Sequence, residues 1–154
     1  MQGIALSGGA GALSIIFALI LVYKVIKGDE GNSAMQEIAK AIQEGSQAFL
    51  KREYTFLVLF VAAVTIVLIA IPAIDWQTAA AYVAGAVVSG ATGYLGMSVA
   101  TRANIRTTAA AAKGLNPALR LAFSSGAVMG LMVVGVGLIG VSALYYIFGE
   151  YGAT

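Results

Sequence analysis

The sequence predicts an all-α, polytopic membrane protein with four transmembrane helices. Of the 154 residues, 60% are hydrophobic and only 10% are charged, whereas about 25% of the residues in a soluble domain are charged. The charged residues leave four long uncharged runs, and an apolar helix of about 20 residues crosses the hydrocarbon core of a bilayer. We therefore expect one membrane domain over residues 1–154, with spans at about 3–26, 54–74, 76–101 and 121–148.

The first apolar run is expected to remain in the membrane as a helix. A secretory signal peptide opens with basic residues before its apolar stretch. Here no lysine or arginine precedes the run, and Lys24 and Lys27 follow it. That order favours an amino terminus outside the cytoplasm.

The distribution of basic residues predicts the rest of the topology. All nine lie in two segments, one between the first and second spans and one between the third and fourth: Lys24, Lys27, Lys40, Lys51 and Arg52, then Arg102, Arg106, Lys113 and Arg120. Because basic loops stay in the cytoplasm, both segments are expected there and both termini outside. The link between the second and third spans carries only Asp75.

A cytoplasmic amphipathic helix is predicted to lead directly into the second span. Glycines and acids at 28–31 break the first helix, Ser33 is expected to cap the next one, and Gln36 is its capping-box partner. Apolar or small residues then recur at helical spacing: Met35, Ile38, Ile42, Gly45 and Phe49.

Residues that favour helix ends and membrane interfaces mark the other boundaries. Pro72 is expected to end the second span, and Asp75 to cap the third rather than to bind an ion. Aromatic residues at the span ends predict an outer interfacial belt of Trp76, Tyr82, Tyr145, Tyr146, Phe148 and Tyr151, and an inner one of Tyr23 and Tyr54.

Small residues form stripes along two spans. One stripe, in the third span, contains Ala81, Gly85, Ser89 and Gly93, and the other, in the fourth, contains Gly126, Gly130, Gly137 and Gly140. Such stripes let helix backbones approach closely in lipid, so these residues are predicted to pack against other helices.

Residues able to do chemistry are scarce. The chain has no histidine and no cysteine, and no catalytic, cofactor-binding or metal-binding residue is assigned. The glycine-rich stretch 7–14 lacks the Gly-Lys-Ser/Thr ending of a phosphate loop, and Glu53 is interpreted as an interfacial anchor rather than a proton carrier. A net charge of +2 is too small to suggest a nucleic-acid partner. Four basic residues are assigned membrane anchoring, with steering of an anionic substrate or lipid as the alternative: Arg102, Arg106, Lys113 and Arg120.

Three sequence blocks resemble the membrane-integral inorganic pyrophosphatases, in that family's order and spacing. They are MQEIAKAIQEGSQAFLKREY at 35–54, GYLGMSVATRANIRT at 93–107 and AFSSGAVMG at 122–130. The resemblance implies a pump that couples pyrophosphate hydrolysis to the export of protons or sodium ions. It also implies a homodimer with external termini and about sixteen spans per subunit, of which this chain resembles the first four. The form of the second block favours a prokaryotic plasma membrane.

The resemblance also implies that the catalytic residues lie elsewhere in the pump. The family binds pyrophosphate and Mg²⁺, and in some members responds to K⁺, through aspartates and lysines on later spans. This chain has two aspartates, Asp29 and Asp75, predicted on opposite sides of the membrane. The segment alone is therefore expected to be inactive, as part of the pump's outer layer beside the lipid bilayer and the remaining helices.

Two other classes of protein share the four-span pattern. A small four-span multidrug exporter would need an acidic residue within the first span, and residues 1–23 contain none. A non-enzymatic four-span scaffold or accessory subunit stays open as the alternative function. The residues themselves favour neither protons nor sodium as the transported ion.

Overall fold

The computed structural model describes residues 2–149, and within that range the chain forms four long α-helices and no β-strand. They are α1 (Gln2–Ile26), α2 (Ser33–Ala70), α3 (Trp76–Ala111) and α4 (Leu115–Phe148). All four are long and apolar enough to cross a membrane. The predicted all-α fold with four spans is confirmed. Tyr151, assigned above to the outer aromatic belt, lies outside the described residues.

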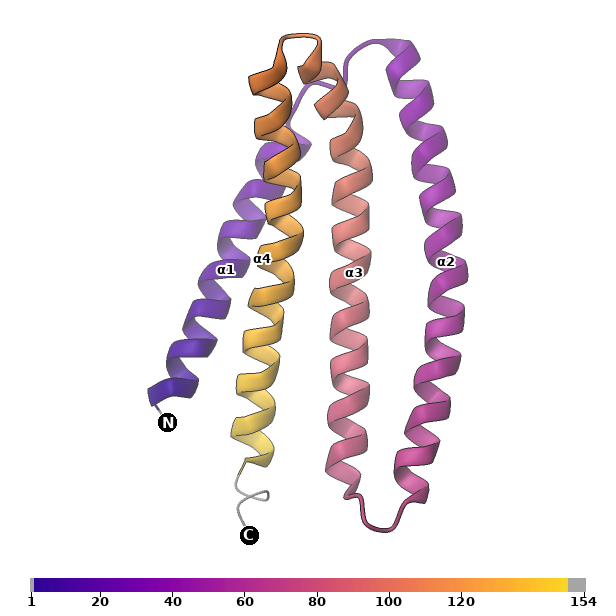
Figure 1. The fold of residues 1–154 in the computed structure, drawn as a ribbon, viewed down its shortest axis with the longest axis vertical. Coiled ribbons are helices and arrows are strands. Elements are labelled where there is room, and N and C mark those ends of the chain that lie inside the picture. The colour runs from indigo at the N-terminus through magenta and orange to yellow at the C-terminus, as the bar shows by residue number, and fades with distance from the viewer. Residues whose placement is uncertain (1, 150–154) are drawn as a thin grey trace.

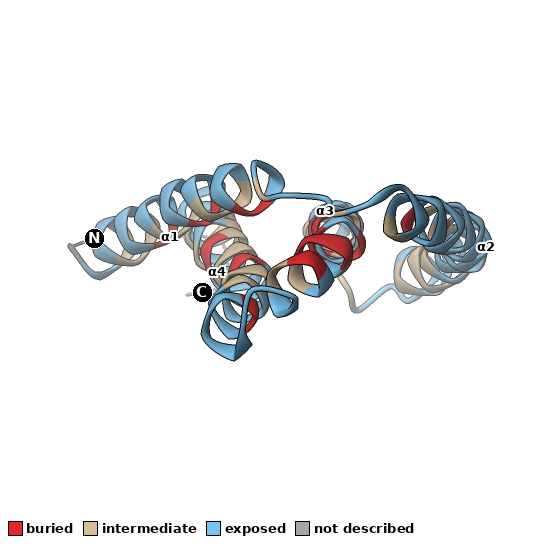
Figure 2. Cartoon of the chain, turned by 90° about the horizontal axis from the view of Figure 1, so that it is seen from above, coloured by how far each residue is buried: buried red, intermediate tan, exposed pale blue. Residues whose placement is uncertain are grey.

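The helices stand side by side in a single row rather than in a closed bundle. Figures 1 and 2 show the order α1, α4, α3, α2 across the molecule. Within residues 2–149, α4 packs along both α1 and α3, α2 packs only on α3, and α1 touches α3 slightly. This row leaves both of its broad faces open, so most large apolar side chains are exposed.

The buried core lies where α1, α3 and α4 meet. Val25 of α1, Val99 and Ala103 of α3, and Val128 of α4 form one buried cluster. Val25 follows Lys24, and Ala103 follows Arg102, so the cluster sits close to the charged ends of these helices. We call this end of the row, which holds the loop 27–32 and the turn 112–114, the basic end.

The start of α2 differs from the prediction at its cap. Asn32, rather than Ser33, is the N-cap, and its Oδ1 accepts a hydrogen bond from the Met35 N–H at 2.9 Å. Asparagine is at least as good a cap as serine, and Ser33 already belongs to the helix. Gln36 donates to the Gly31 carbonyl at 3.3 Å instead of completing a capping box. Gly31 has φ +71°, a conformation that favours glycine.

Three of the helices extend beyond the predicted spans at the basic end. The predicted amphipathic segment and second span form one continuous helix of 38 residues, α2, which is about 57 Å long. A hydrocarbon core is only about 30 Å thick. Likewise α3 continues past residue 101 to Ala111, and α4 begins at Leu115 rather than at 121. These helices are therefore longer than a crossing of the hydrocarbon core requires, and the added length lies toward the loop 27–32 and the turn 112–114.

The opposite end is organised around Pro72 and an aromatic contact. Helix α2 ends at Ala70 and Ile71 is extended, as expected for a chain approaching a proline. Asp75 occupies the N-cap position of α3, but its side chain makes no capping hydrogen bond. The rings of Trp76 and Phe148 meet edge to face with centroids 6.4 Å apart, which joins the start of α3 to the end of α4.

Tyr54 of α2 makes two contacts with α3. Its hydroxyl donates to the Gly90 carbonyl of α3, and its ring meets that of Tyr94 edge to face at 6.3 Å. Tyr54 thus joins α2 to α3, and its place in the inner interfacial belt stays a prediction. Buried polar tips of aromatic residues need such partners.

The closest backbone approach in the row joins α1 to α4. A Cβ added to Gly11 would lie 2.7 Å from the Gly135 carbonyl oxygen, and one added to Gly135 would lie 2.8 Å from that of Gly11. The Ser7 and Ser142 hydroxyls are 2.9 Å apart, and Ser14 donates to the Leu131 carbonyl at 2.9 Å. Small residues and hydroxyl bonds are the usual means by which helices associate in lipid.

The glycine stripes predicted for helix packing face mostly away from this contact. A Cβ added at five of the positions would meet nothing within 4 Å among the described residues: Gly85, Gly126, Gly130, Gly137 and Gly140. Gly93 lies beside the Tyr54 hydroxyl, at 3.3 Å from the added Cβ, and Ser89 is exposed. Packing of these residues against helices outside residues 2–149 stays a prediction.

Gly135→Leu should separate α1 from α4. The larger side chain would meet the Gly11 backbone, which cannot move aside cheaply, and overpacking of this kind costs roughly 1–3 kcal/mol. The measurement is disulfide formation in a Ser7→Cys/Ser142→Cys background, where the two side chains already touch. Gly130→Leu, on the open face, is the matched control and should leave cross-linking unchanged. Equal loss of cross-linking in both variants would contradict the assignment of this contact.

Candidate functional site

Four charged residues meet at the basic end of the row. They come from the loop after α1, from α3 and from the turn before α4, and we call them the charged cluster: Asp29, Glu30, Arg106 and Lys113. These positions are far apart in the sequence. The cluster is therefore a product of the fold, and it ties the first loop to the second basic segment.

Arg106 is the buried member of the charged cluster, with only 6% of its surface exposed. Its Nη2 donates to Glu30 Oε1 at 2.5 Å, its Nε to the Ile26 carbonyl at 2.9 Å, and its Nη1 to the Arg102 carbonyl at 2.6 Å. Burying a charge is costly unless it is paired and hydrogen-bonded. Arg106 meets that requirement through one carboxylate and two backbone carbonyls.

The bond from Arg106 to Ile26 also completes the end of α1. Ile26 is the last residue of that helix, and the carbonyls of a last turn have no partner inside the helix. They also carry the negative end of the helix dipole, which a cation stabilises. Arg106 thus supplies both a donor and a positive charge to the end of α1.

Lys113 and Asp29 form the exposed pair of the cluster. Lys113 Nζ lies 2.8 Å from Asp29 Oδ2, and both side chains are more than half exposed. The hydrogen bond from Lys113 lowers the pKa of Asp29 below its usual value, helped by the Gly31 N–H and by the charge of Lys113. A lowered carboxyl pKa favours the folded state at neutral pH, and this contribution is lost as the pH falls through the folded-state pKa. Such exposed pairs contribute little stability.

The four basic residues singled out in the sequence do not act as one group. A turn at 112–114 separates Arg102 and Arg106 on α3 from Arg120 on α4, so the four do not share one helix face. Arg106 and Lys113 pair with acids, whereas the Arg102 side chain is exposed and Arg120 lies on α4 beside Lys24 of α1. The roles of these residues in anchoring or steering stay predictions.

The sequence interpretation missed Asp29 and Glu30 as partners of the basic residues. Both were treated as part of a helix-breaking loop. Their position on the same side of the membrane as both basic segments was the available signal. The choice of Arg106 and Lys113 as partners depends on how α3 lies against the end of α1, and sequence spacing does not contain that information.

Within residues 2–149, no group of three or more histidine, cysteine, aspartate or glutamate side chains could hold a metal ion. Asp75 lies at the start of α3 and Asp29 at the opposite end of the row. Glu53 is an exposed residue of α2, and the glycine-rich stretch 7–14 lies inside α1. The charged cluster itself is electrically balanced, with two carboxylates facing two cations, so its observed role is structural.

Comparison with known proteins assigns the chain to a family. Residues 12–154 match the model of the family described as inorganic H⁺ pyrophosphatase. The chain belongs to this family. The resemblance noted in the three sequence blocks is thereby confirmed, and the blocks at 35–54 and 93–107 lie on α2 and α3 of the pyrophosphatase chain.

Curated relatives of this pyrophosphatase chain are pyrophosphate-energised pumps. A K⁺-insensitive proton pump of Methanosarcina mazei is 42% identical over 92% of the chain. A putative K⁺-stimulated sodium pump of Clostridium tetani is 49% identical over 91%, and a K⁺-stimulated sodium pump of Thermotoga maritima is 39% identical over 88%. The matches cover 21%, 20% and 19% of these relatives, so the chain spans about a fifth of their length.

Arg106→Ala should destabilise the fold. It would leave the partly buried Ile26 carbonyl at the end of α1 without its donor, and an unsatisfied buried acceptor costs roughly 1–3 kcal/mol. The measurement is the free energy of unfolding in mixed micelles. Arg102→Ala is the matched control, because that side chain is exposed, and it should stay within about 0.5 kcal/mol of the parent. Equal stability of the two variants would show that the buried bonds of Arg106 contribute nothing.

Proposed function

We propose that this chain forms the amino-terminal, outer-layer part of an ion-translocating membrane pyrophosphatase, which couples pyrophosphate hydrolysis to the export of protons or sodium ions. The observation that carries the proposal is the match to pyrophosphate-energised pumps along about nine-tenths of the chain. The same observation favours the pump over a non-enzymatic scaffold. Relatives named as proton pumps and as sodium pumps both match, so the proposal includes either ion.

The chemistry of the complete pump would reside outside residues 2–149. Pyrophosphate hydrolysis requires metal ions and cationic groups that offset the charge of the substrate and position water. Mg²⁺ takes oxygen ligands from carboxylates and from the substrate, and the described residues offer no acidic group able to hold it. Mg²⁺, and K⁺ where it stimulates, would therefore bind on other helices of the pump. The role of α1 to α4 is to support those helices.

The open faces of the helix row suit an outer layer of a larger membrane protein. No residue is buried in the most apolar stretch of α2. Large side chains of this helix, such as Phe56, Phe60 and Ile66, are at least 60% exposed. One face of the row would contact lipid. The other would contact the remaining helices of the pump and, in a homodimer, a second subunit.

The basic end is proposed to lie in the cytoplasm. The loop 27–32 and the turn 112–114 at this end lie within the two basic segments, and positively charged loops are retained on that side. Arg102 and Arg120, exposed on α3 and α4, are proposed as anchors at the interface. The opposite end, with Trp76 and Phe148, then faces outward in a prokaryotic plasma membrane.

The 154-residue chain in vesicles with Mg²⁺ and K⁺ should not hydrolyse pyrophosphate, because its described part gathers no carboxylates around a metal. The complete protein that contains these residues should hydrolyse it. Phosphate release is the measurement, and membranes carrying an empty vector are the control. Mg²⁺-dependent hydrolysis by the isolated chain would contradict the location of the catalytic residues. Absence of hydrolysis in the complete protein would favour the scaffold instead.

A cysteine at Gln77 should react with a membrane-impermeant thiol reagent added to intact cells, whereas cysteines at Asn32 and Lys113 should not. The reason is that Gln77 lies near the end of the row opposite the loop 27–32 and the turn 112–114, and that no basic residue occurs between residues 53 and 101. Permeabilised cells, in which all three should react, provide the control. Labelling of Lys113→Cys from outside, with Gln77→Cys silent, would reverse the proposed orientation.

A further inference from the structure

A groove lies between α1 and α4 at the basic end of the row. Its volume is about 510 Å³, and seven residues line it: Lys24, Val25, Asn116, Pro117, Arg120, Leu121 and Ser124. We call it the α1–α4 groove. It is distinct from the charged cluster, with which it shares no residue.

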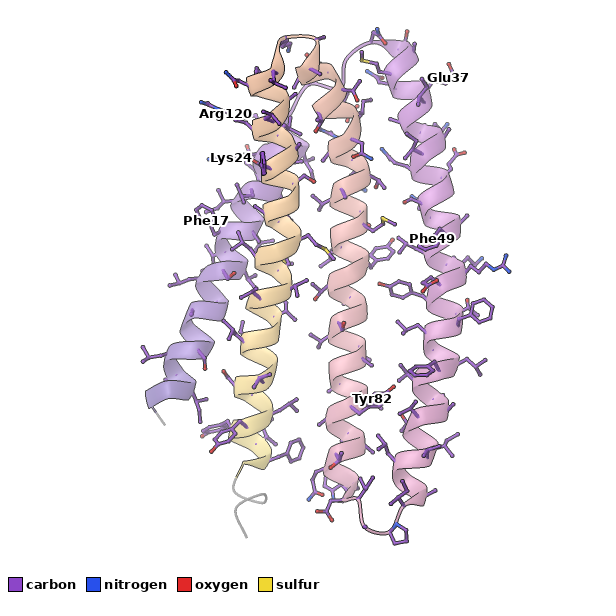
Figure 3. The ribbon with its side chains drawn as sticks, viewed as in Figure 1. Phe17, Lys24, Glu37, Phe49, Tyr82 and Arg120 are labelled. Carbon is purple, nitrogen blue, oxygen red and sulfur yellow. The ribbon has the colours of Figure 1, made fainter. Side chains whose placement is uncertain are left out.

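The two cations of the α1–α4 groove differ from those of the charged cluster. Arg106 and Lys113 each contact a carboxylate, whereas no carboxylate within residues 2–149 contacts Lys24 or Arg120. Both groove cations are exposed, and Figure 3 shows them close together at the edge formed by α1 and α4. Two adjacent positive charges without a counter-ion favour an anionic ligand.

The polar groups beside these cations also favour an anion. Arginine offers planar paired donors and lysine a compact point charge, and both suit phosphate oxygens. The Asn116 side chain adds an exposed amide next to them. The Ser124 hydroxyl already donates to the Arg120 carbonyl at 2.7 Å. Lys24, Arg120 and Asn116 are therefore the donors available to a ligand.

An apolar surface continues from the groove toward the middle of the membrane. Phe17 and Ile20 precede Lys24 by seven and four residues, so they share its face of α1, and they are 58% and 46% exposed. Figure 3 shows Phe17 on the same edge as Lys24 and Arg120. On α4, Phe123 follows Arg120 by three residues and is 74% exposed. A cationic groove above an exposed apolar surface fits a ligand with a phosphate head and hydrocarbon tails.

We propose that the α1–α4 groove binds an anionic phospholipid, with the phosphate between Lys24 and Arg120 and the acyl chains along Phe17 and Ile20. A soluble anion would use the cations but would gain nothing from the apolar surface. A zwitterionic phospholipid would bring the positive group of its head toward the positive charges of Lys24 and Arg120. The proposal concerns lipid recognition and holds independently of the pumping activity proposed above.

The test is native mass spectrometry of the complete protein that contains residues 1–154, released from detergent micelles. It is titrated with dioleoyl phosphatidylglycerol and, separately, with dioleoyl phosphatidylcholine, which has the same tails. The parent protein should bind phosphatidylglycerol more tightly than phosphatidylcholine. Lys24→Gln/Arg120→Gln should weaken that binding roughly 10- to 30-fold, since each basic residue near a membrane surface contributes about 1 kcal/mol. The same variant should bind phosphatidylcholine nearly as well as the parent protein does.

Matched variants separate the groove from general charge and from misfolding. Lys40→Gln/Arg52→Gln removes one lysine and one arginine elsewhere, at exposed positions of α2, and should retain the preference. Lys24→Arg/Arg120→Lys keeps both charges and should also retain it. If the double glutamine variant does not fold, Arg120→Gln alone should weaken binding about fivefold.

Four results would overturn the proposal. They are an absent preference in the parent protein, full binding by Lys24→Gln/Arg120→Gln, equal weakening by both double glutamine variants, and displacement of the lipid by millimolar inorganic phosphate or pyrophosphate. The last result would assign the groove to a soluble anion. A lipid preference lost only in the groove variant supports the proposal, whether or not the protein hydrolyses pyrophosphate.

Discussion

The buried guanidinium of Arg106 is the interaction on which the basic end of this molecule depends. One side chain of α3 reaches the last carbonyl of α1, a carbonyl of its own helix and the carboxylate of Glu30 in the following loop. Otherwise α1 and α3 touch only slightly, because α4 lies between them along most of their length. Together with the pair of Lys113 and Asp29, this residue holds the loop 27–32 that leads to the start of α2. A lysine could not reproduce its planar set of donors.

The single row of helices follows from the weakness of the hydrophobic effect inside a bilayer. Lipid tails are as apolar as leucine, so apolar surface alone does not bring helices together. The contacts that do hold the row are specific: glycines at 11 and 135 allow α1 to approach α4, and Tyr54 joins α2 to α3 through a backbone carbonyl. Between these contacts the broad faces of the row remain exposed. A row of this kind suits a pyrophosphatase portion that packs on further helices.

The sequence predicts the features of this fold that depend on local composition. Hydrocarbon thickness and the position of charges define four spans, and Pro72 marks the end of α2. Features that depend on neighbours were missed. Asn32 and Ser33 are both good caps, and only the path of the loop selects Asn32. The helical extensions to Ala111 and from Leu115 lie beyond the uncharged runs, which hydropathy alone does not predict. Glycine spacing identifies helix faces made of small residues, but not the helix that each face contacts. It therefore predicts packing at Gly126 and Gly130 and does not single out Gly11 and Gly135, where α1 approaches α4.

The charged residues at the basic end fall into a paired group and an unpaired group. In the charged cluster each cation already faces a carboxylate, and pyrophosphate entering there would have to displace Glu30 and Asp29 from their partners. Such a balanced group adds little net potential toward an anion, because the fields of opposite charges cancel beyond a few ångströms. Lys24 and Arg120 are not balanced in this way, but they lie on the edge of the row beside exposed apolar side chains. The charges paired in the cluster thus join the first loop to α3 and to the turn before α4, whereas Lys24 and Arg120 remain available to the anionic lipid proposed above. The charges that act on pyrophosphate would then come from the rest of the pump.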